Sequence, residues 1–188
     1  MRLKVVALVA LLFVAIVSKA QYNGGYGTAA QVGIVLKDAP RQSSPTSTYH
    51  NSRFGFYYTY PRFMVPQGGG ANGDGGRFSS ADGRVYAETW AMLNALDYTT
   101  NSLLQSMKGS LISDGCRITY SFAKNGTVVL SGYTRSGKIF YDKYVLCKLH
   151  SATYGYVDVV ACAKVEYYQN DKYRGEEVIK HFSGFPYE

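Results

Sequence analysis

The sequence contains no long block of charge of one sign. Lysine and arginine together number 20 and aspartate and glutamate 13 among 188 residues, a net charge of +7. Three of the basic residues lie in an N-terminal segment that we expect to be cleaved, which leaves 17 bases, 13 acids and a net charge of +4. That balance is ordinary for a folded domain and offers no basic patch for a phosphate backbone, so nucleic acid is not expected as a partner.

Cysteine and histidine are scarce, with three residues of each. Their spacing fits no zinc site, and the sequence contains neither a Gly-x-Ser-x-Gly elbow nor the Cys/His signature of a known protease type. We therefore expect no metal, no cofactor and no recognisable catalytic centre. An enzyme with dispersed active groups stays open, because side chains far apart in sequence can converge in space.

Long apolar runs are missing beyond the N-terminus. The run Val5–Val17 follows the basic start Met1–Lys4 and precedes Ser18-Lys19-Ala20, whose small residues are typical of a signal cleavage site. Its 13 residues are too few to span a bilayer comfortably, so we predict that residues 1–20 form a secretory signal peptide, with an uncleaved anchor as the alternative. The mature chain is then periplasmic or extracellular, begins at Gln21 and has no integral membrane span.

Tyrosine is abundant, with 18 residues against nine Phe and one Trp. Tyrosine suits the half-buried surface of a sheet, and it also enriches binding faces. Residues 21–48 are rich first in Gly and Tyr and then in Ser and Pro, which predicts a tail or linker. Residues 49–188 are the predicted folded domain, and about 140 residues suffice to bury a core.

Alternating apolar and polar residues between Arg117 and Tyr168 predict a run of antiparallel strands joined by tight turns. The strongest turn signal is Asn125-Gly126, because a type I′ turn needs positive φ at both central residues. Asn125-Gly126-Thr127 is also an acceptor triplet for N-glycosylation, which matters only if the source is a eukaryote.

Two of the cysteines, Cys147 and Cys162, fall on neighbouring predicted strands. A short turn near Ser151–Tyr154 sets them some four residues out of register, beyond the reach of a disulfide. A disulfide between them therefore requires a bulge that shifts the pairing.

Two segments carry the signals of helices. Apolar residues at helical spacing predict a helix over Asn101–Ser110, capped by Thr99 or Thr100. Early acids and late bases predict a second helix over Asp171–Phe182. Strands with an inserted helix and a terminal helix predict an α+β domain, an antiparallel sheet with helices packed on its faces.

Two fragments of known motifs are better explained as turns. Gly132–Lys138 matches the first seven positions of a phosphate-binding loop, but Ile139 stands where a Ser or Thr should hold magnesium. Asn72-Gly73-Asp74 and Asp82-Gly83 suggest pieces of a calcium loop, but the residues that follow do not supply oxygen ligands at alternate positions. We predict a hairpin turn at Gly132–Lys138 and ordinary turns at the other two places.

A glycine-rich stretch is the most distinctive part of the domain. Val65–Gly76 contains six glycines and predicts a long loop between strands. Glycine loops let a backbone approach a partner closely, so we expect Gln67–Phe78 to be a contact surface. The candidate binding residues are Gln67, Gly68, Asn72, Asp74 and Arg77, with Tyr133 beside them.

Several phrases together resemble a group of exported bacterial domains of uncharacterised role that have a PsbP-like fold. They are Asn51–Phe56, Tyr60-Pro61, Val65–Gly68, Asn72–Phe78, Val129–Tyr133, Gly137–Tyr141 and Val178–Phe182. The resemblance covers roughly Tyr49 to Pro186 and implies an α-β-α sandwich. It implies no catalytic residues, because characterised relatives of this fold act by binding proteins. The Tyr/Gly-rich tail and the three cysteines depart from the pattern, so the identity of a partner does not carry over.

The leading functional hypothesis is an exported, non-enzymatic binding or accessory module that docks a protein or a cell-envelope component. The alternative is an exported hydrolase or carbohydrate-active protein with dispersed carboxylates such as Asp74 and Asp82. Two such acids can perform glycosidic chemistry if they lie about 5–10 Å apart across a cleft.

Overall fold

The computed structural model describes residues 46–187 of the chain. The predicted signal peptide and residues 21–45 of the predicted tail lie outside the described residues. In chain order the elements are β1 (Thr46–Asn51), β2 (Phe56–Pro61), β3 (Met64–Gly69), β4 (Gly75–Ser80), β5 (Val85–Leu93), α1 (Thr100–Ser113), β6 (Arg117–Lys124), β7 (Thr127–Tyr133), β8 (Ile139–Ser151), β9 (Gly155–Tyr167), the 3-10 turn η1 (Gln169–Asp171) and α2 (Lys172–Lys180).

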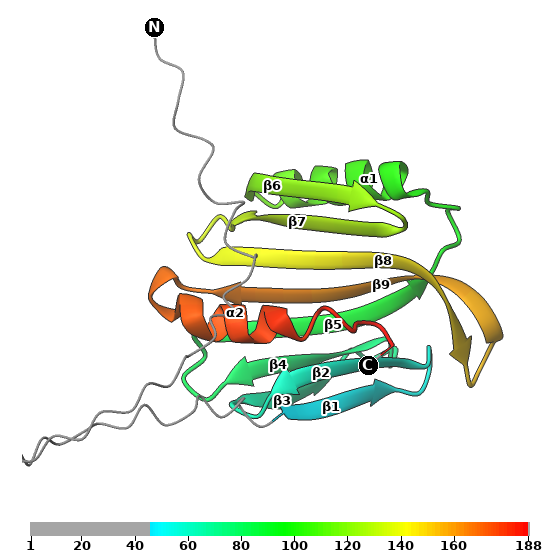
Figure 1. Ribbon diagram of the computed structural model, residues 1–188, viewed down its shortest axis with the longest axis horizontal. Coiled ribbons are helices and arrows are strands. Elements are labelled where there is room, and N and C mark those ends of the chain that lie inside the picture. The colour runs from blue at the N-terminus through cyan, green and yellow to red at the C-terminus, as the bar shows by residue number, and fades with distance from the viewer. Residues whose placement is uncertain (1–45, 188) are drawn as a thin grey trace, which may run out of the picture. The chain divides into compact units, whose positions relative to one another are not determined.

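The strands form two antiparallel sheets. Seven strands make the large sheet in the order β3-β4-β5-β9-β8-β7-β6, and β1 and β2 make a separate two-stranded sheet (Figure 1). After β5 the chain passes through α1 to the far edge, and the next strands fill the sheet back toward β5. The 13-residue strands β8 and β9 pair along their whole length and form the centre of the sheet.

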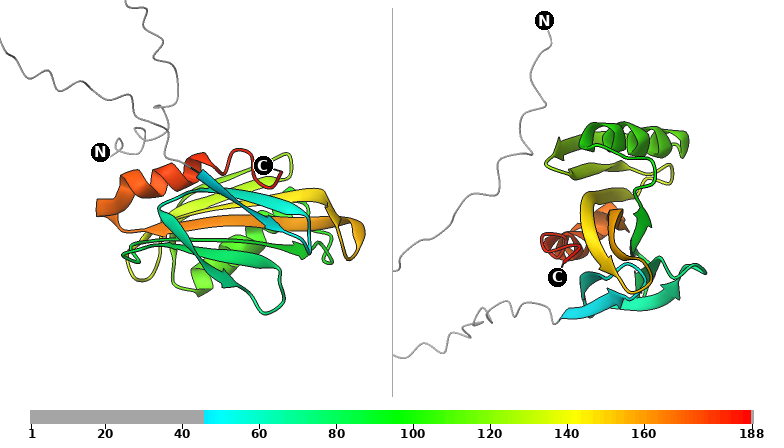
Figure 2. Two further views of the ribbon diagram at one scale, coloured as in Figure 1. Left: turned by 90° about the horizontal axis from the view of Figure 1, so that it is seen from below. Right: turned by 90° about the vertical axis from the view of Figure 1, so that its right-hand side faces the viewer.

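The large sheet has a core on each face because successive side chains of a strand point to opposite sides. In β9, Val159, Ala161 and Val165 pack in the cluster that includes the β1–β2 sheet and α2. The alternate residues Val160 and Cys162 pack in the cluster beneath α1. We call these the α2 face and the α1 face, and Figure 2 shows the two helices on opposite sides of the sheet.

The predicted α+β sandwich is wrong, and the fold is mainly β. Strands take 52% of the described residues and helices 18%. Seven strands at about 4.8 Å spacing make a sheet roughly 29 Å wide, which one short helix on each face cannot cover. The β1–β2 sheet supplies much of the second layer, with buried Phe56 and Tyr58 facing the large sheet.

The predictions of individual turns and helices are confirmed, unlike the predicted fold class. Asn125 and Gly126 have φ of 49° and 77°, which confirms the hairpin turn between β6 and β7. Thr99 caps α1, since its side chain accepts from the backbone of Ser102 while the Ser102 hydroxyl accepts from Thr99 N. The terminal helix forms at Lys172–Lys180, within the predicted range. Within residues 46–187 no helix is both long enough and apolar enough to cross a membrane.

Candidate functional site

The glycine-rich stretch is a hairpin, so the predicted long loop is wrong in its extent. β3 continues to Gly69 and β4 begins at Gly75, which leaves a short turn over residues 70–74. Gly73 N donates to Gly70 O at 3.0 Å within it. A register shift lies between Pro66 and Gly69. We call residues 70–74 the glycine turn.

Neighbouring elements hold the glycine turn in place. Asn51, at the end of β1, donates from Nδ2 to Gly73 O at 2.9 Å, and Arg53 donates from Nη1 to Asn72 O. On the other side, Ala91 N donates to Asp74 O at 2.9 Å. Hydrogen bonds from β1, from Arg53 in the segment after β1 and from β5 therefore hold the turn.

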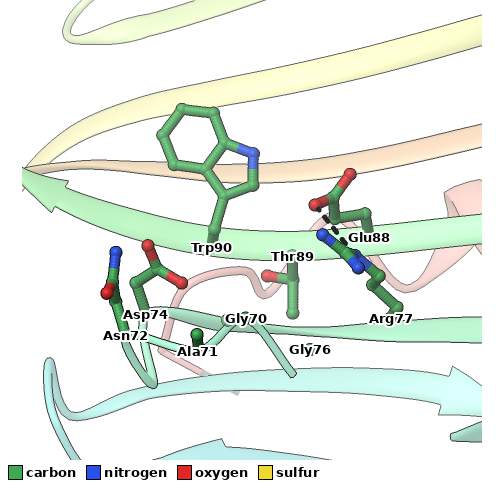
Figure 3. Close-up of a pocket in the computed structure, with 10 residues that line it drawn as sticks. Gly70, Ala71, Asn72, Asp74, Gly76, Arg77, Glu88, Thr89 and Trp90 are labelled. Atoms are coloured by element: carbon green, nitrogen blue, oxygen red, sulfur yellow. Dashed lines mark ion pairs between the residues drawn. The ribbon is translucent and has the colours of Figure 1, made fainter. Parts of the chain in front are cut away.

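A polar hollow of about 220 Å³ lies beside the glycine turn. Its lining comes from residues 70–72 and 74–77 of the hairpin and from residues 88–90 of β5. Figure 3 shows Asn72 and Asp74 at one end, the Arg77–Glu88 pair at the other, and Trp90 rising from β5. We call this space the glycine-turn hollow.

The hollow exists because glycines form its floor. Gly75 pairs directly with Trp90 across β4 and β5, and a Cβ there would lie 2.8 Å from Trp90 Cα. A Cβ at Gly70 would lie 2.8 Å from Asp74 Oδ1. Side chains at these positions would clash or fill the space, so glycine both permits the close strand approach and keeps the hollow open.

Two walls of the hollow are defined by the cross-strand register. Arg77 opposes Glu88, and Arg77 Nε lies 3.7 Å from Glu88 Oε1 with the two side chains 54% and 27% exposed. Trp90, two residues along β5, is partly exposed and packs on the α1-face core, with its ring 6.2 Å from that of Tyr144 in an edge contact. Exposed ion pairs contribute little to stability, so Arg77 and Glu88 remain available to a ligand.

The structure brings three of the predicted binding residues together. Asn72, Asp74 and Arg77 all line the hollow. Gln67 and Gly68 lie on β3 outside the lining, where Gln67 Nε2 donates to Val65 O at 3.1 Å.

Tyr133 lies on another part of the sheet. It ends β7, next to the edge strand β6, and carries the Arg117 guanidinium 4.5 Å above its ring. β5, β9 and β8 separate β7 from β4 in the sheet, so Tyr133 does not belong to the hollow.

The sequence interpretation missed Glu88 and Trp90. The sequence did contain a signal for Glu88. A turn at Ala81-Asp82-Gly83 pairs the strand before it with the strand after it, and that pairing places Arg77 opposite Glu88. The alternation of β5 then puts Glu88 and Trp90 on one face.

The acids suggested for hydrolysis do not meet. Asp74 precedes β4 and Asp82 follows it, which separates them by roughly 20 Å at about 3.3 Å per residue. Asp82 is bound by Arg174 at 2.8 Å, and the hydrogen bonds from Arg174 and Ser80 hold the pKa of Asp82 well below its usual range. These two carboxylates therefore cannot flank one scissile bond.

The other motif fragments form turns. Thr134 N donates to Lys138 O at 2.8 Å and Gly137 has φ of 81°, so the phosphate-loop match is the turn between β7 and β8. Across residues 46–187 no group of three or more His, Cys, Asp and Glu residues is placed to hold a metal ion.

Cys147 and Cys162 are both free in the structure. Cys147 pairs with Val159 and Cys162 with Tyr144, so the two thiols lie three positions apart along the ladder. Cys147 packs on the α2 face and Cys162 on the α1 face. A disulfide between them is not formed, because the two side chains lie on opposite faces of the sheet.

A buried acid lies on the α1 face, two strands from Glu88 of the hollow. Asp142 is fully buried, accepts from the Tyr144 hydroxyl at 3.0 Å and lies 4.0 Å from Lys164 Nζ. Within residues 46–187 its Oδ1 has no hydrogen-bond partner. Desolvation raises the pKa of Asp142 to about 6, although Lys164 and Tyr144 oppose the rise. Sequence reasoning missed this residue, because its position in β8 looks like an ordinary polar alternation.

The fold and the site define a mainly antiparallel β domain with a preformed polar hollow at one hairpin. No protein-family model matches the chain, and no curated protein matches it. The resemblance to PsbP-like exported domains therefore stays an expectation from the sequence, and the function has to be inferred from the hollow itself.

Proposed function

We propose that the domain is an exported binding module that docks a protein or another cell-envelope component through the surface around the glycine-turn hollow. The observation that carries the proposal is the convergence of three segments on one preformed space. The glycine turn contributes Asn72 and Asp74, β4 contributes Arg77, and β5 contributes Glu88 and Trp90. Mixed polar side chains beside an aromatic ring are typical of recognition sites.

The size of the hollow favours a large ligand that inserts one group. Its volume of about 220 Å³ is below the roughly 300–1,000 Å³ of pockets that enclose a whole drug-sized molecule. A single side chain or one unit of a polymer fits such a space, while the rest of the partner contacts the surrounding strands.

The fixed turn supports binding in a second way. Asn51 and Ala91 hold the backbone of the glycine turn from opposite sides, so little conformational entropy is lost when a ligand binds. We infer binding rather than glycosidic hydrolysis because Asp74 and Asp82 lie at opposite ends of β4.

The test is capture of material from the cell envelope of the source organism by the immobilised mature protein. Replacing the hollow pair with R77A/E88A should lower the recovered material at least about tenfold, because both groups would contact the ligand directly. The matched control is K148A/D158A, which removes another cross-strand ion pair. Lys148 Nζ lies 2.9 Å from Asp158 Oδ2, near the turn that joins β8 and β9.

Both variants should keep the wild-type circular dichroism spectrum and nearly the wild-type unfolding midpoint. Equal capture by the wild type and the two variants would remove the hollow as the docking surface.

A further inference from the structure

We propose that the group entering the glycine-turn hollow is a neutral sugar unit of a glycan. The inference rests on the proposed function and names the ligand class of that same site. It follows from the charge balance, the hydrogen-bonding groups and the aromatic surface of the hollow.

Charged groups of both signs lie around the hollow. Glu88 lies between two bases in the cross-strand register, Arg77 on β4 and Lys164 on β9, and Lys164 Nζ also lies 4.0 Å from the buried Asp142. Asp74 adds one carboxylate at the opposite end. A neutral polar ligand can use both members of the Arg77–Glu88 pair, one as a hydrogen-bond donor and the other as an acceptor.

The hydrogen-bonding groups match hydroxyls better than they match a peptide side chain. A sugar hydroxyl both donates and accepts, and neighbouring hydroxyls on one ring present several such groups close together. Asp74 and Glu88 accept, Arg77 donates, and the amide of Asn72 does both. These groups come from opposite ends of the hollow, so one ring can bridge them.

Trp90 supplies the complementary apolar surface. The C–H face of a pyranose ring is apolar, and it packs on an indole because both surfaces leave water together. Tyr144 and the α1-face core hold the Trp90 ring from behind while part of it remains exposed. The glycine floor leaves room for the ring without offering the apolar pocket that a leucine or phenylalanine side chain would need.

Trp90 also provides the measurement, because it is the only tryptophan in the chain. The mature protein is titrated with maltose, cellobiose and N,N′-diacetylchitobiose while tryptophan emission is recorded. Glycerol serves as a hydroxyl control without a ring, and N-acetyl-lysine amide and N-acetyl-glutamate amide represent protein side chains. We expect a saturable change with at least one disaccharide and a Kd on the order of 1 mM, as the efficiency of small ligands suggests.

The variants separate a site from a non-specific effect. R77A/E88A should raise the Kd for the disaccharide at least about tenfold, because it removes direct hydrogen bonds to the sugar. Asn72→Ala should raise the Kd about threefold for the same reason. K148A/D158A should bind like the wild type.

Two outcomes overturn the inference in distinguishable ways. If no disaccharide changes the emission, or if only the lysine or glutamate amide does, the sugar assignment fails; envelope capture that still requires Arg77 and Glu88 then leaves the binding function standing. If capture does not depend on Arg77 and Glu88 either, the proposed function fails with it.

Discussion

Asn51 Nδ2 donates a hydrogen bond of 2.9 Å to Gly73 O, which links the end of β1 to the glycine turn 22 residues later. The same amide donates to the Tyr49 hydroxyl at 3.0 Å, and its Oδ1 accepts from Phe54 N at 2.9 Å. Asn51 is only 3% exposed, so water cannot replace these bonds. One buried amide thus couples the small sheet to the candidate site.

Asn51→Ala should lower the free energy of unfolding by about 2 kcal/mol, because it leaves buried donors and acceptors without partners. Urea unfolding followed by circular dichroism measures the effect. The control is Asn101→Ala on the exposed side of α1, which should change stability by no more than about 0.5 kcal/mol. Equal effects of the two substitutions would contradict the anchoring role of Asn51.

Asp142→Asn should stabilise the protein at neutral pH. Burial raises the pKa of Asp142 from 3.8 to about 6, so the native state binds this proton more tightly than the unfolded chain. The contribution of Asp142 to the free energy of unfolding of the wild type is therefore largest below about pH 4 and is lost as the pH rises through about 6. Asn keeps an acceptor for Tyr144 and carries no charge, so its advantage should grow to at most about 3 kcal/mol above that range.

The pH dependence distinguishes this effect from simple repacking. Unfolding at a series of pH values should show the Asp142→Asn advantage nearly vanishing at about pH 4. Asp158→Asn, an exposed acid paired with Lys148, should stay within about 0.5 kcal/mol of the wild type throughout. A gain independent of pH would show that charge burial is not its cause.

Two helical glycines should respond to alanine in opposite directions. A Cβ at Gly175 of α2 would overlap the ring of Tyr167 on β9, so Gly175→Ala should destabilise by about 1–3 kcal/mol. A Cβ at Gly109 of α1 would meet nothing within 4 Å, so Gly109→Ala should stabilise by about 0.5–1 kcal/mol. Thermal or urea unfolding compares them directly, and the same sign for both would disprove the close packing of α2 on β9.

Peptide mapping of the unreduced protein should recover the Cys147 and Cys162 peptides unlinked to each other. The two residues lie three positions apart in register and on opposite faces of the sheet. Mass spectrometry after digestion in the presence of a thiol-blocking reagent makes the measurement. A Cys147–Cys162 peptide in the natively folded protein would mean that the ladder of β8 and β9 is shifted.

Local features were predictable because they depend on residues close together in the chain. Asn125-Gly126 determines its own turn through positive φ, and Thr99 and Ser102 form their cap within a single helical turn. The fold class was not predictable in this way. Whether a helix or a sheet covers the α2 face depends on where residues 46–61 dock, which the alternation within the strands does not specify.

The candidate site illustrates the same division. The glycines, Asn72, Asp74 and Arg77 stood out in the sequence, but the stretch was expected to be a loop because glycine favours turns. Pairing with β4 extends β3 to Gly69, and pairing with β5 extends β4 to Gly75 and brings Glu88 and Trp90 beside the stretch.

The sequence by itself determined the Asn125-Gly126 turn, the N-terminal cap of α1 and the alternation of the long strands, since each follows from neighbouring residues. Only the tertiary structure decided that the fold is mainly β, that Asp142 is buried and that a hollow opens beside Trp90. These properties arise from contacts between segments far apart in the chain, and their energies depend on which surfaces the whole fold removes from water.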